Sequence, residues 1–426
     1  MRSAVAFISV LSVIASLQTP PLAAEPILEK MDLFTAGEQG YVMFRIPGLL
    51  VTPKGTLLAY CEARAGGGDW TNEDILLRRS TDSGRTWDKA RVLVKLPDPQ
   101  PRNPLREELK AELGEGQIDA RTYHNCVMIA DGESGAVHVL FHLDYWRVFY
   151  MRSDDDGLTF TAPRELTAVV AGYRSKGYPW RVVGNGCGHG IQLAAGTWKG
   201  RLLVPLWLSD SSQPRGHGHR PSHVGLLYSD DHGDTWQIGD WVAKNGAGIK
   251  SPSEACAVQL ADGRVLFNMR HESHQRLRAV VTSADGATGW SPLRFDPALY
   301  DPICEASMIC VPQRESDHRV VLFANPDPRG AAPGEDDKPD PPEPRARRNL
   351  TLKLSYDECA SWPVRKVLES GIAGYSDLAA ADDGTLFCLF ERGSTKRGDH
   401  YATAALTLAR FNLEWLSDGH GAPKEP

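Results

Sequence analysis

The sequence of 426 residues lacks both a long hydrophobic run and a block of basic residues. A membrane-spanning helix needs about 20 consecutive apolar residues, and no segment reaches that length. The net charge is −7, and this mild acidity argues against binding to the phosphate backbone of a nucleic acid. We therefore expect neither a membrane span nor a nucleic-acid partner.

Cysteine motifs are missing as well. The spacing of the eight cysteines matches no disulfide framework and no zinc motif. Cys388, in the apolar stretch "LFCLF", is expected to be a buried thiol, and the sequence leaves open whether Cys304 and Cys310 pair. The stretch "RGHGHRPSH", residues 215–223, is interpreted as a solvated loop rather than a set of metal ligands. We expect no metal and no cofactor.

The first 24 residues differ from the rest of the chain. Arg2 precedes the apolar run "AVAFISVLSVIASL", and "QTPPLAAEP" follows with helix breakers and small residues. This pattern is typical of a secretory signal peptide with cleavage near Ala23 or Ala24, and a buried N-terminal helix is the alternative. We expect residues 25–426 to form a single domain that is secreted or periplasmic.

Helical periodicity is nearly absent, and its best candidate, "NPLREELKAEL" at 103–113, is interpreted as an insertion. Short β-rich runs with Gly or Asp turns fill the rest, for example "GRLLVPLWLS" and "GRVLFNMR". Between them one motif recurs, in full as "RSTDSGRTW", "RSDDDGLTF" and "YSDDHGDTW", and more loosely as "SADGATGW" and "LSYDECASW". The first serines of these five copies are Ser80, Ser153, Ser229, Ser283 and Ser355.

The spacing of the copies predicts the architecture. The intervals of 73, 76, 54 and 72 residues are too long for a solenoid turn but suit a sheet of several strands. We expect an all-β fold, a six-bladed β-propeller of four-stranded sheets in which one blade has no visible copy. Within each copy, Asp and Gly form a tight turn, Ser and Asp bind local backbone amides, and Trp packs under the turn. Such Asp boxes indicate an architecture, not a chemistry.

A different motif indicates chemistry. In "YVMFRIPGLL", residues 41–50, Arg45 stands within an apolar strand, where an arginine is uncommon unless a carboxylate meets it. With the Asp boxes, "FRIP" resembles the signature of the sialidases, and the resemblance covers nearly the whole mature chain. It implies an exo-acting enzyme that releases terminal sialic acid with retention of configuration. Its partners would be sialylated glycans, glycoproteins or glycolipids.

The resemblance also implies three arginines that bind the substrate carboxylate. Arg45 matches the first, and Arg270, at the end of "GRVLFNMR", matches the second. In "ARRNLTLKLSYDE" the arginine two positions before the Asn is Arg347, with Arg348 as the fallback and Arg345 as a third candidate. A planar carboxylate accepts bidentate guanidinium forks, and a guanidinium stays charged at any working pH.

Further residues match the family's supporting and acid/base positions. Glu391 in "LFCLFERG" matches a glutamate that supports the first arginine. Asp69 lies on the Gly-rich loop "GGGDW" shortly after that arginine and matches the general acid/base. Asp74 opens an apolar strand and is interpreted as a structural or rim residue. Glu62 and Arg64 are expected to line the same wall of the site.

The nucleophile of the family is a tyrosine. Sialic acid carries a carboxylate on its anomeric carbon, so a neutral phenol avoids the repulsion that an Asp or Glu nucleophile would meet. The matching residue is Tyr375 in "GIAGYSDL", and the matching base that takes its proton is Glu254 in "SPSEACAV". Their intervals to the matched arginines, 28 residues after Arg347 and 16 before Arg270, agree with the family pattern.

Three departures from the family pattern stand out. Glu305 in "CEAS" replaces a frequent Gln, which bears on substrate preference rather than on the reaction. A Gly-rich turn, "VGNGCGHGIQL", carries an unusual Cys187 and His189. The Pro- and acid-rich stretch at 325–348 is predicted to be a disordered excursion.

Three functions compete on this sequence. The first is a metal-independent, retaining exo-α-sialidase with a tyrosyl-enzyme intermediate, and it is favoured because every expected group is present. The second is a glycosidase for another 2-keto acid sugar, such as deaminated sialic acid. The third is a sialic-acid-binding propeller without catalysis, and transfer to an acceptor sugar is a variant of the first.

Overall fold

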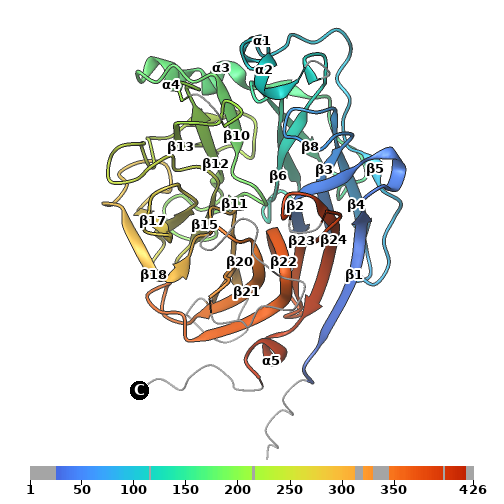
Figure 1. Ribbon diagram of the computed structural model, residues 1–426. Coiled ribbons are helices and arrows are strands. Elements are labelled where there is room, and N and C mark those ends of the chain that lie inside the picture. Colours follow the sequence, from blue (N-terminus) through green and yellow to red (C-terminus); the bar gives the residue numbers. More distant parts are fainter. Residues whose placement is uncertain are drawn as a thin grey trace, which may run out of the picture.

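The computed structural model describes residues 25–114, 117–213, 216–311, 320–329, 345–396 and 399–418. This part of the chain consists mainly of antiparallel strands, which follow one another from blue to red in Figure 1. The all-β class predicted from the sequence is therefore confirmed. The predicted signal peptide, residues 1–24, and residues 330–344 of the Pro- and acid-rich stretch lie outside the described residues.

Four sheets follow one another along the first two thirds of the chain. The first contains β2 (Met43–Val51), β3 (Leu57–Arg64), β4 (Glu73–Ser80) and β5 (Arg91–Val92). The second contains β6 (Tyr123–Ala130), β7 (Val137–Leu143), β8 (Arg147–Ser153) and β9 (Arg164–Glu165). The third contains β10 (Val182–Asn185), β11 (Ile191–Gln192), β12 (Leu202–Ser209), β13 (Ser222–Ser229) and β14 (Gln237–Ile238). The fourth contains β15 (Ala255–Gln259), β16 (Val265–Met269), β17 (Leu277–Ser283) and β18 (Arg294–Tyr300).

The remaining strands form one sheet of seven strands in the order β1-β24-β23-β22-β21-β20-β19. Its members are β19 (Ser307–Val311), β20 (Val320–Pro326), β21 (Arg348–Ser355), β22 (Val364–Ala380), β23 (Leu386–Ser394), β24 (Thr403–Phe411) and β1 (Leu28–Thr35). The first half of the long strand β22 pairs with β21, and its second half pairs with β23. The sheet therefore consists of two four-stranded groups that share β22.

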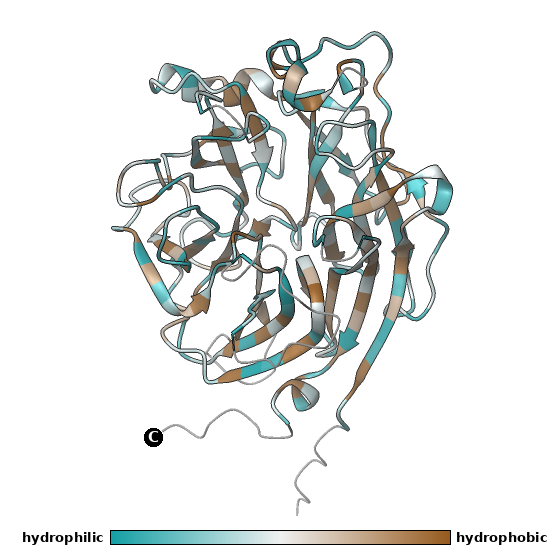
Figure 2. Cartoon of the chain, in the orientation of Figure 1, coloured by the Kyte–Doolittle hydropathy of each residue, from teal (hydrophilic) through white to brown (hydrophobic). Residues whose placement is uncertain are grey.

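Hydrophobic clusters lie between successive groups of strands, and Figure 2 shows the hydrophobic residues distributed along the strands. Tyr60 of the first sheet shares a cluster with Phe141 of the second. Another cluster joins the two ends of the described chain, because it contains both Phe44 of β2 and Leu408 of β24. Burial of apolar surface between the groups thus holds distant parts of the sequence together.

The repeated motif folds as the sequence predicts. In its first copy the Gly84 amide donates to Ser80 Oγ at 2.9 Å, and the Thr86 amide donates to Asp82 Oδ1 at 2.9 Å. The indole of Trp87 donates to the Gly84 carbonyl at 3.0 Å, under the turn. Gly84 has a φ of 80°, which explains the glycine at this position. The other four copies form the corresponding Ser and Asp bonds.

The position of the boxes explains why one four-stranded group has none. Each box connects the third and fourth strands of its group, as between β4 and β5. In the group β22-β23-β24-β1 the fourth strand is β1, which comes from the other end of the chain. No hairpin joins its third and fourth strands, so there is no turn for a box to close.

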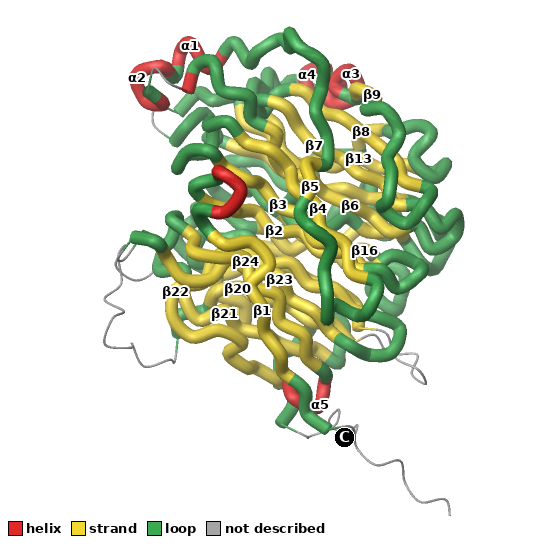
Figure 3. Tube along the Cα trace, turned by 90° about the vertical axis from the view of Figure 1, so that its right-hand side faces the viewer, coloured by secondary structure: helices red, strands yellow, loops and turns green. Residues whose placement is uncertain are grey.

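The helices are short and peripheral, as the side view in Figure 3 shows. They are the 3₁₀ turn η1 (Glu38–Gly40) and the α-helical turns α1 (Leu105–Glu108), α2 (Lys110–Leu113), α3 (Thr167–Val170), α4 (Gly172–Ser175) and α5 (Leu413–Leu416). The pair α1 and α2 confirms the predicted helical insertion at 103–113, between β5 and β6. Within the described ranges, no helix has the length and apolar character that crossing a membrane requires.

All eight cysteines lie in described parts of the chain, and none of them forms a disulfide there. Cys388 is fully buried, which confirms its predicted environment. Cys304 and Cys310, whose pairing the sequence left open, are not joined in the structure.

Candidate active site

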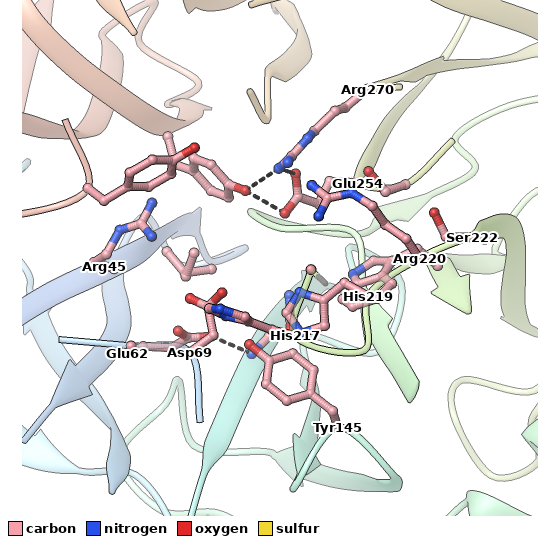
Figure 4. Close-up of a pocket in the computed structure, with 18 of the residues that line it drawn as sticks. Arg45, Glu62, Asp69, Tyr145, His217, His219, Arg220, Ser222, Glu254 and Arg270 are labelled. Atoms are coloured by element: carbon pink, nitrogen blue, oxygen red, sulfur yellow. Dashed lines mark hydrogen bonds and ion pairs between the residues drawn. The ribbon is translucent and has the colours of Figure 1, made fainter. Parts of the chain in front are cut away.

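A cavity of about 350 Å³ lies where the ends of strands from several sheets meet. Figure 4 shows Arg45 at one end, Asp69 and Glu62 along one wall, and Glu254 with Arg270 across from them. The lining comes from all of these groups of strands and their loops, including Asn125 and Tyr145 of the second sheet and Arg347 directly before β21. Segments that are more than 350 residues apart in sequence therefore meet here, since both Arg45 and Tyr401 line the cavity.

Left-handed backbone conformations mark the strand segments around the cavity. Ile46, Asn125, Ser251, Ile303 and Asn349 all have φ between 41° and 59°. The pairing register shifts at Ile46, Asn125 and Asn349, as in β-bulges, which re-aim the neighbouring side chains. Such conformations are unfavourable for residues other than glycine, and they persist only where the surrounding structure fixes them.

Arg45 is buried and paired with the predicted supporting carboxylate. Its Nε and one terminal nitrogen donate to Glu391 at 2.9 and 3.1 Å, and the Ile46 amide adds a third bond at 3.2 Å. Burial acts to lower the pKa of Arg45, but the negative charge of Glu391 opposes burial, and the pKa lies above its ordinary value. A Cβ at Gly374 would lie 2.1 Å from Glu391 Oε2, so the glycine lets this carboxylate approach the strand of Tyr375. Arg45 is thus fixed in its charged form.

Arg347 and Arg270 complete the arginine set and keep unused donors. Arg347 donates to the Ile303 carbonyl at 2.7 Å, and no described residue accepts from its other terminal nitrogen. The Nε of Arg270 likewise has no acceptor within the described chain. The guanidinium carbons of Arg45 and Arg347 lie 5.2 and 5.1 Å from the ring centroid of Tyr375. These three arginines therefore present donors to an anion at one end of the cavity.

Tyr375, Glu254 and Arg270 form a hydrogen-bonded triangle. The Tyr375 hydroxyl donates to Glu254 Oε1 at 2.5 Å, and Arg270 donates to both Glu254 Oε2 and the Tyr375 oxygen at 2.5 Å. Burial raises the pKa of Tyr375 well above its ordinary value, although Arg270 opposes this. Burial also acts to raise the pKa of Glu254, but Arg270 and the bond from Tyr375 hold it below its ordinary value. A neutral phenol thus faces an ionised carboxylate that can accept its proton.

Asp69 lies on the opposite wall within a separate network. Arg64 donates to Asp69 at 2.7 Å and to Glu62 at 2.6 Å, and its Nε lies 3.4 Å from Glu73. The Asp69 side chain is 33% exposed, whereas Glu62 and Glu73 are buried. Burial acts to raise the pKa of Asp69, but Arg64, together with His219 and Arg45, holds the pKa well below its ordinary value. Asp69 is the carboxylate of this network that faces the cavity opening.

The predicted solvated loop at 215–223 instead forms part of the cavity wall, so that interpretation was wrong. The rings of His219 and Tyr145 lie 4.8 Å apart, and the amides of Gly216 and His217 donate to Glu112 of α2. Burial lowers the pKa of His219 to about 4, so this imidazole is neutral at neutral pH. The loop is held by the helical insertion, which no local motif in the sequence indicates.

The end of the cavity near this loop has unused polar atoms. Trp207 Nε1, His219 Nε2 and Ser251 Oγ are buried, and no described residue bonds to them. Buried donors without partners are unfavourable, so this end suits a ligand that carries hydroxyl or carbonyl oxygens.

The fallback candidates lie outside the cavity lining. Arg348 is a buried member of β21 opposite Ile372, and Arg345 is exposed, so Arg347 is the arginine of this segment that reaches the cavity. Asp74 accepts a hydrogen bond from Tyr41 at 2.6 Å and does not line the cavity, in line with a structural residue.

The departures from the family pattern lie behind Tyr375. Glu305 is 2% exposed and accepts from the Ser376 amide at 3.0 Å. Cys187 packs against the Tyr375 side chain, and His189 donates to Asp377 at 2.7 Å. None of the three residues lines the cavity. They support the strand that carries Tyr375.

Comparison with known proteins agrees with this arrangement. Residues 117–388 match the model of the BNR repeat-like domain. A sialidase of Micromonospora viridifaciens is 30% identical over 95% of this chain and 56% of its own length. A sialidase of Bacteroides fragilis is 28% identical over 84% of this chain and 61% of its own length. The chain thus spans well under two thirds of the length of these curated relatives.

A solved structure, the Hadza microbial sialidase Hz136, superposes with a TM-score of 0.69. It is 24% identical, with 91% of this chain and 69% of that chain covered, and so it supports the fold alone. The chain belongs to the BNR repeat-like domain family. The resemblance to bacterial-type sialidases that "FRIP" and the Asp boxes suggested is confirmed.

Proposed function

We propose that the six four-stranded groups form a closed six-bladed β-propeller. In support, β1 completes the last group beside β24, and a hydrophobic cluster joins that group to the first sheet. In this proposal residues 25–426 form one catalytic domain, and residues 1–24 are a signal peptide that directs it to the periplasm or the cell exterior.

We further propose that the protein is a retaining exo-α-sialidase. The observation that carries this proposal is the hydrogen-bonded triangle of Tyr375, Glu254 and Arg270 beside the donors of Arg45 and Arg347. In this proposal Tyr375 is the nucleophile and Glu254 its base, and the neighbouring arginines bind the substrate carboxylate. A substrate with a carboxylate on its reacting carbon, as sialic acid has, needs both groups at once.

In the first step the Tyr375 oxygen forms a bond to the anomeric carbon while Glu254 takes the phenolic proton. The bond from that carbon to the glycosidic oxygen breaks, and Asp69 gives its proton to the departing oxygen. Glu254 lowers the barrier because its carboxylate lies 2.5 Å from the hydroxyl and is ionised. The product is a tyrosyl-enzyme intermediate and a free alcohol.

In the second step Asp69, now a carboxylate, takes a proton from water as the water oxygen attacks the anomeric carbon. The Tyr375 oxygen leaves and recovers its proton from Glu254. Two inversions at one carbon give net retention. At the end of the cycle Tyr375 has recovered its own proton, and Asp69 carries a proton from water in place of the one that left with the alcohol.

The low pKa of Asp69 applies to the enzyme without substrate, where Arg64 and Arg45 face it. A bound carboxylate adds a negative charge beside Arg45, which raises the pKa of Asp69. Substrate binding therefore favours the protonated acid that the first step needs. We expect an acidic to near-neutral optimum, and maximal activity only above pH 9 would contradict this role for Asp69.

The test is release of free sugar from 2,3- and 2,6-linked sialyllactose, followed by NMR. Prompt appearance of the α-anomer supports a retaining sialidase, and prompt appearance of the β-anomer contradicts the tyrosyl intermediate. A parallel assay uses the deaminated sugar, the alternative substrate. If a folded protein cleaves neither class, a binding protein without catalysis becomes the better explanation.

A further inference from the structure

Tyr401 is an exposed aromatic residue at the mouth of the cavity. Its side chain is 51% exposed, and among the exposed large hydrophobic residues of the described chain it is the one that lines the cavity. An exposed aromatic face is unfavourable in water, and such faces often mark binding sites. Neither the chemistry of the proposed reaction nor the sequence motifs account for this ring.

The hairpin between β23 and β24 fixes the backbone around Tyr401. The Tyr401 amide donates to Asp399 Oδ1 at 2.9 Å, and the Thr395 amide donates to the Ala402 carbonyl at 2.8 Å. The Ser394 hydroxyl bonds to the Asp399 carbonyl at 2.6 Å. These bonds fix the described backbone on both sides of the ring, so a ligand that contacts the ring has little ordering of that backbone to compensate.

The ring lies beside two of the arginines that would bind a carboxylate on the anomeric carbon. Its centroid is 4.8 Å from the guanidinium carbon of Arg347 and 5.9 Å from that of Arg45. Asp69 and Arg45 line the same cavity as Tyr401. If Asp69 protonates the departing oxygen, the unit attached to that oxygen leaves the cavity past Tyr401.

We propose that Tyr401 forms a binding subsite for the neutral sugar unit to which the acidic sugar is attached. The inference rests on the proposed function. A neutral hexopyranose presents a face of C–H groups, and the negative π-face of a phenol ring attracts such a face while excluding water from it. The subsite selects a glycan over a sialoside with a small leaving group.

A different role for the ring would have a different signature. A ring that only shields Arg45 and Arg347 from water would strengthen binding of every carboxylate ligand equally. Stacking on the leaving sugar strengthens only those substrates that carry one. Two substrates with the same acidic sugar and different leaving groups therefore separate the two roles.

The experiment compares kcat/KM of wild type, Tyr401→Ala and Tyr401→Phe on sialyllactose and on methyl α-sialoside. Trp198→Ala is the matched control, because Trp198 is 42% exposed and stacks 4.0 Å from Arg201 away from the cavity. We expect Tyr401→Ala to lose about tenfold on sialyllactose, mainly in KM, and less than twofold on the methyl sialoside. Tyr401→Phe and Trp198→Ala should match wild type on both.

A second readout is binding of free lactose, measured by saturation-transfer NMR. Wild type and Tyr401→Phe should show transfer to the lactose C–H protons, and Tyr401→Ala should lose it. Equal losses on both substrates, or no loss on either, would overturn the inference while leaving the sialidase proposal intact. If wild type cleaves neither substrate, the proposed function fails, and retained lactose binding would not rescue the inference.

Discussion

The two ends of the same strands differ in how their polar groups are paired. Strand β4 begins at Glu73, beside the cavity, and ends at Ser80, in the first Asp box. At the box end, polar groups are paired within a few residues, as Ser80 is with Gly84. At the cavity end, buried atoms such as Glu73 Oε2 have no partner among the described residues, and like charges are close together.

This difference shows where the chain is optimised for stability and where it is not. The boxes satisfy their own donors and acceptors, so each contributes to the fold by itself. The cavity keeps five left-handed residues, crowded carboxylates and unused donors, which are unfavourable without a ligand. Substitutions at the box end should therefore change stability alone, and substitutions at the cavity end should change activity first.

The largest expected effect is at the nucleophile. Tyr375→Phe removes the oxygen that attacks, and we expect kcat to fall by about 10³-fold or more, with an unchanged melting temperature. Steady-state and single-turnover kinetics on sialyllactose measure it. Tyr41→Phe is the control, because Tyr41 bonds to Asp74 outside the cavity. A Tyr375→Phe enzyme within tenfold of wild type would exclude this residue as the nucleophile.

Two adjacent arginines give the next contrast. Arg347 lines the cavity and Arg348 does not, although both are buried. Arg347→Lys loses the planar fork, and we expect kcat/KM to fall by about 10²-fold. Arg348→Lys should stay within threefold of wild type. If Arg348→Lys loses more activity than Arg347→Lys in the same assay, Arg348 rather than Arg347 contacts the substrate carboxylate.

The third effect concerns a buried carboxyl and depends on pH. Burial raises the pKa of Glu305 well above its ordinary value, and Asp377 and Glu254 add to this against the Ser376 amide. The pKa of Glu305 is higher in the folded state than in the unfolded state. The free energy of unfolding therefore falls once pH exceeds the unfolded-state pKa of about 4.3, and it continues to fall until pH reaches the folded-state pKa. Glu305→Gln should therefore raise the melting temperature at pH 7.5 by about 2–4 °C and leave it unchanged at pH 4.

Thermal melts at the two pH values check this expectation. Glu107→Gln, at an exposed position, is the control and should change neither melt. A gain of equal size at both pH values would show that ionisation is not the cause.

The smallest effect is at a box. Ser229 Oγ accepts from the Gly233 amide at 2.8 Å and is fully buried. Ser229→Ala should lower the melting temperature by about 1 °C, since a hydrogen bond of this kind contributes about 1 kcal/mol and the domain is large. At 25 °C kcat/KM should not change. A melt equal to that of the exposed-site variant Ser212→Ala would contradict the stabilising role of the box.

Much of this molecule was predictable because its signals are local. The five boxes place hairpins at known positions, and "FRIP" and "GYS" identify Arg45 and Tyr375 within short segments. The all-β class and the helical insertion followed from periodicity in the same way. In each case, residues that are close together in the sequence determine the feature.

Other features could not be predicted, since they depend on distant contacts. The pairing of β1 with β24 joins Leu28 to Phe411, and no motif in either strand indicates the other. His219 reaches the cavity because Glu112 of the insertion binds its loop, and the loop sequence alone suggested a solvated segment. Tyr401 belongs to a hairpin with no repeated pattern, so its place beside Arg347 is visible only in three dimensions.

The pairing of β1 with β24 also sets an order of events during synthesis. The strand at Leu28–Thr35 leaves the ribosome first, yet its partner at Thr403–Phe411 is made more than 360 residues later. Until then β1 has an unpaired edge, which is a site for incorrect association. The last group of strands is therefore completed only when nearly the whole chain is available, and a ribosome that stalls before Thr403 releases a product whose first strand has no partner.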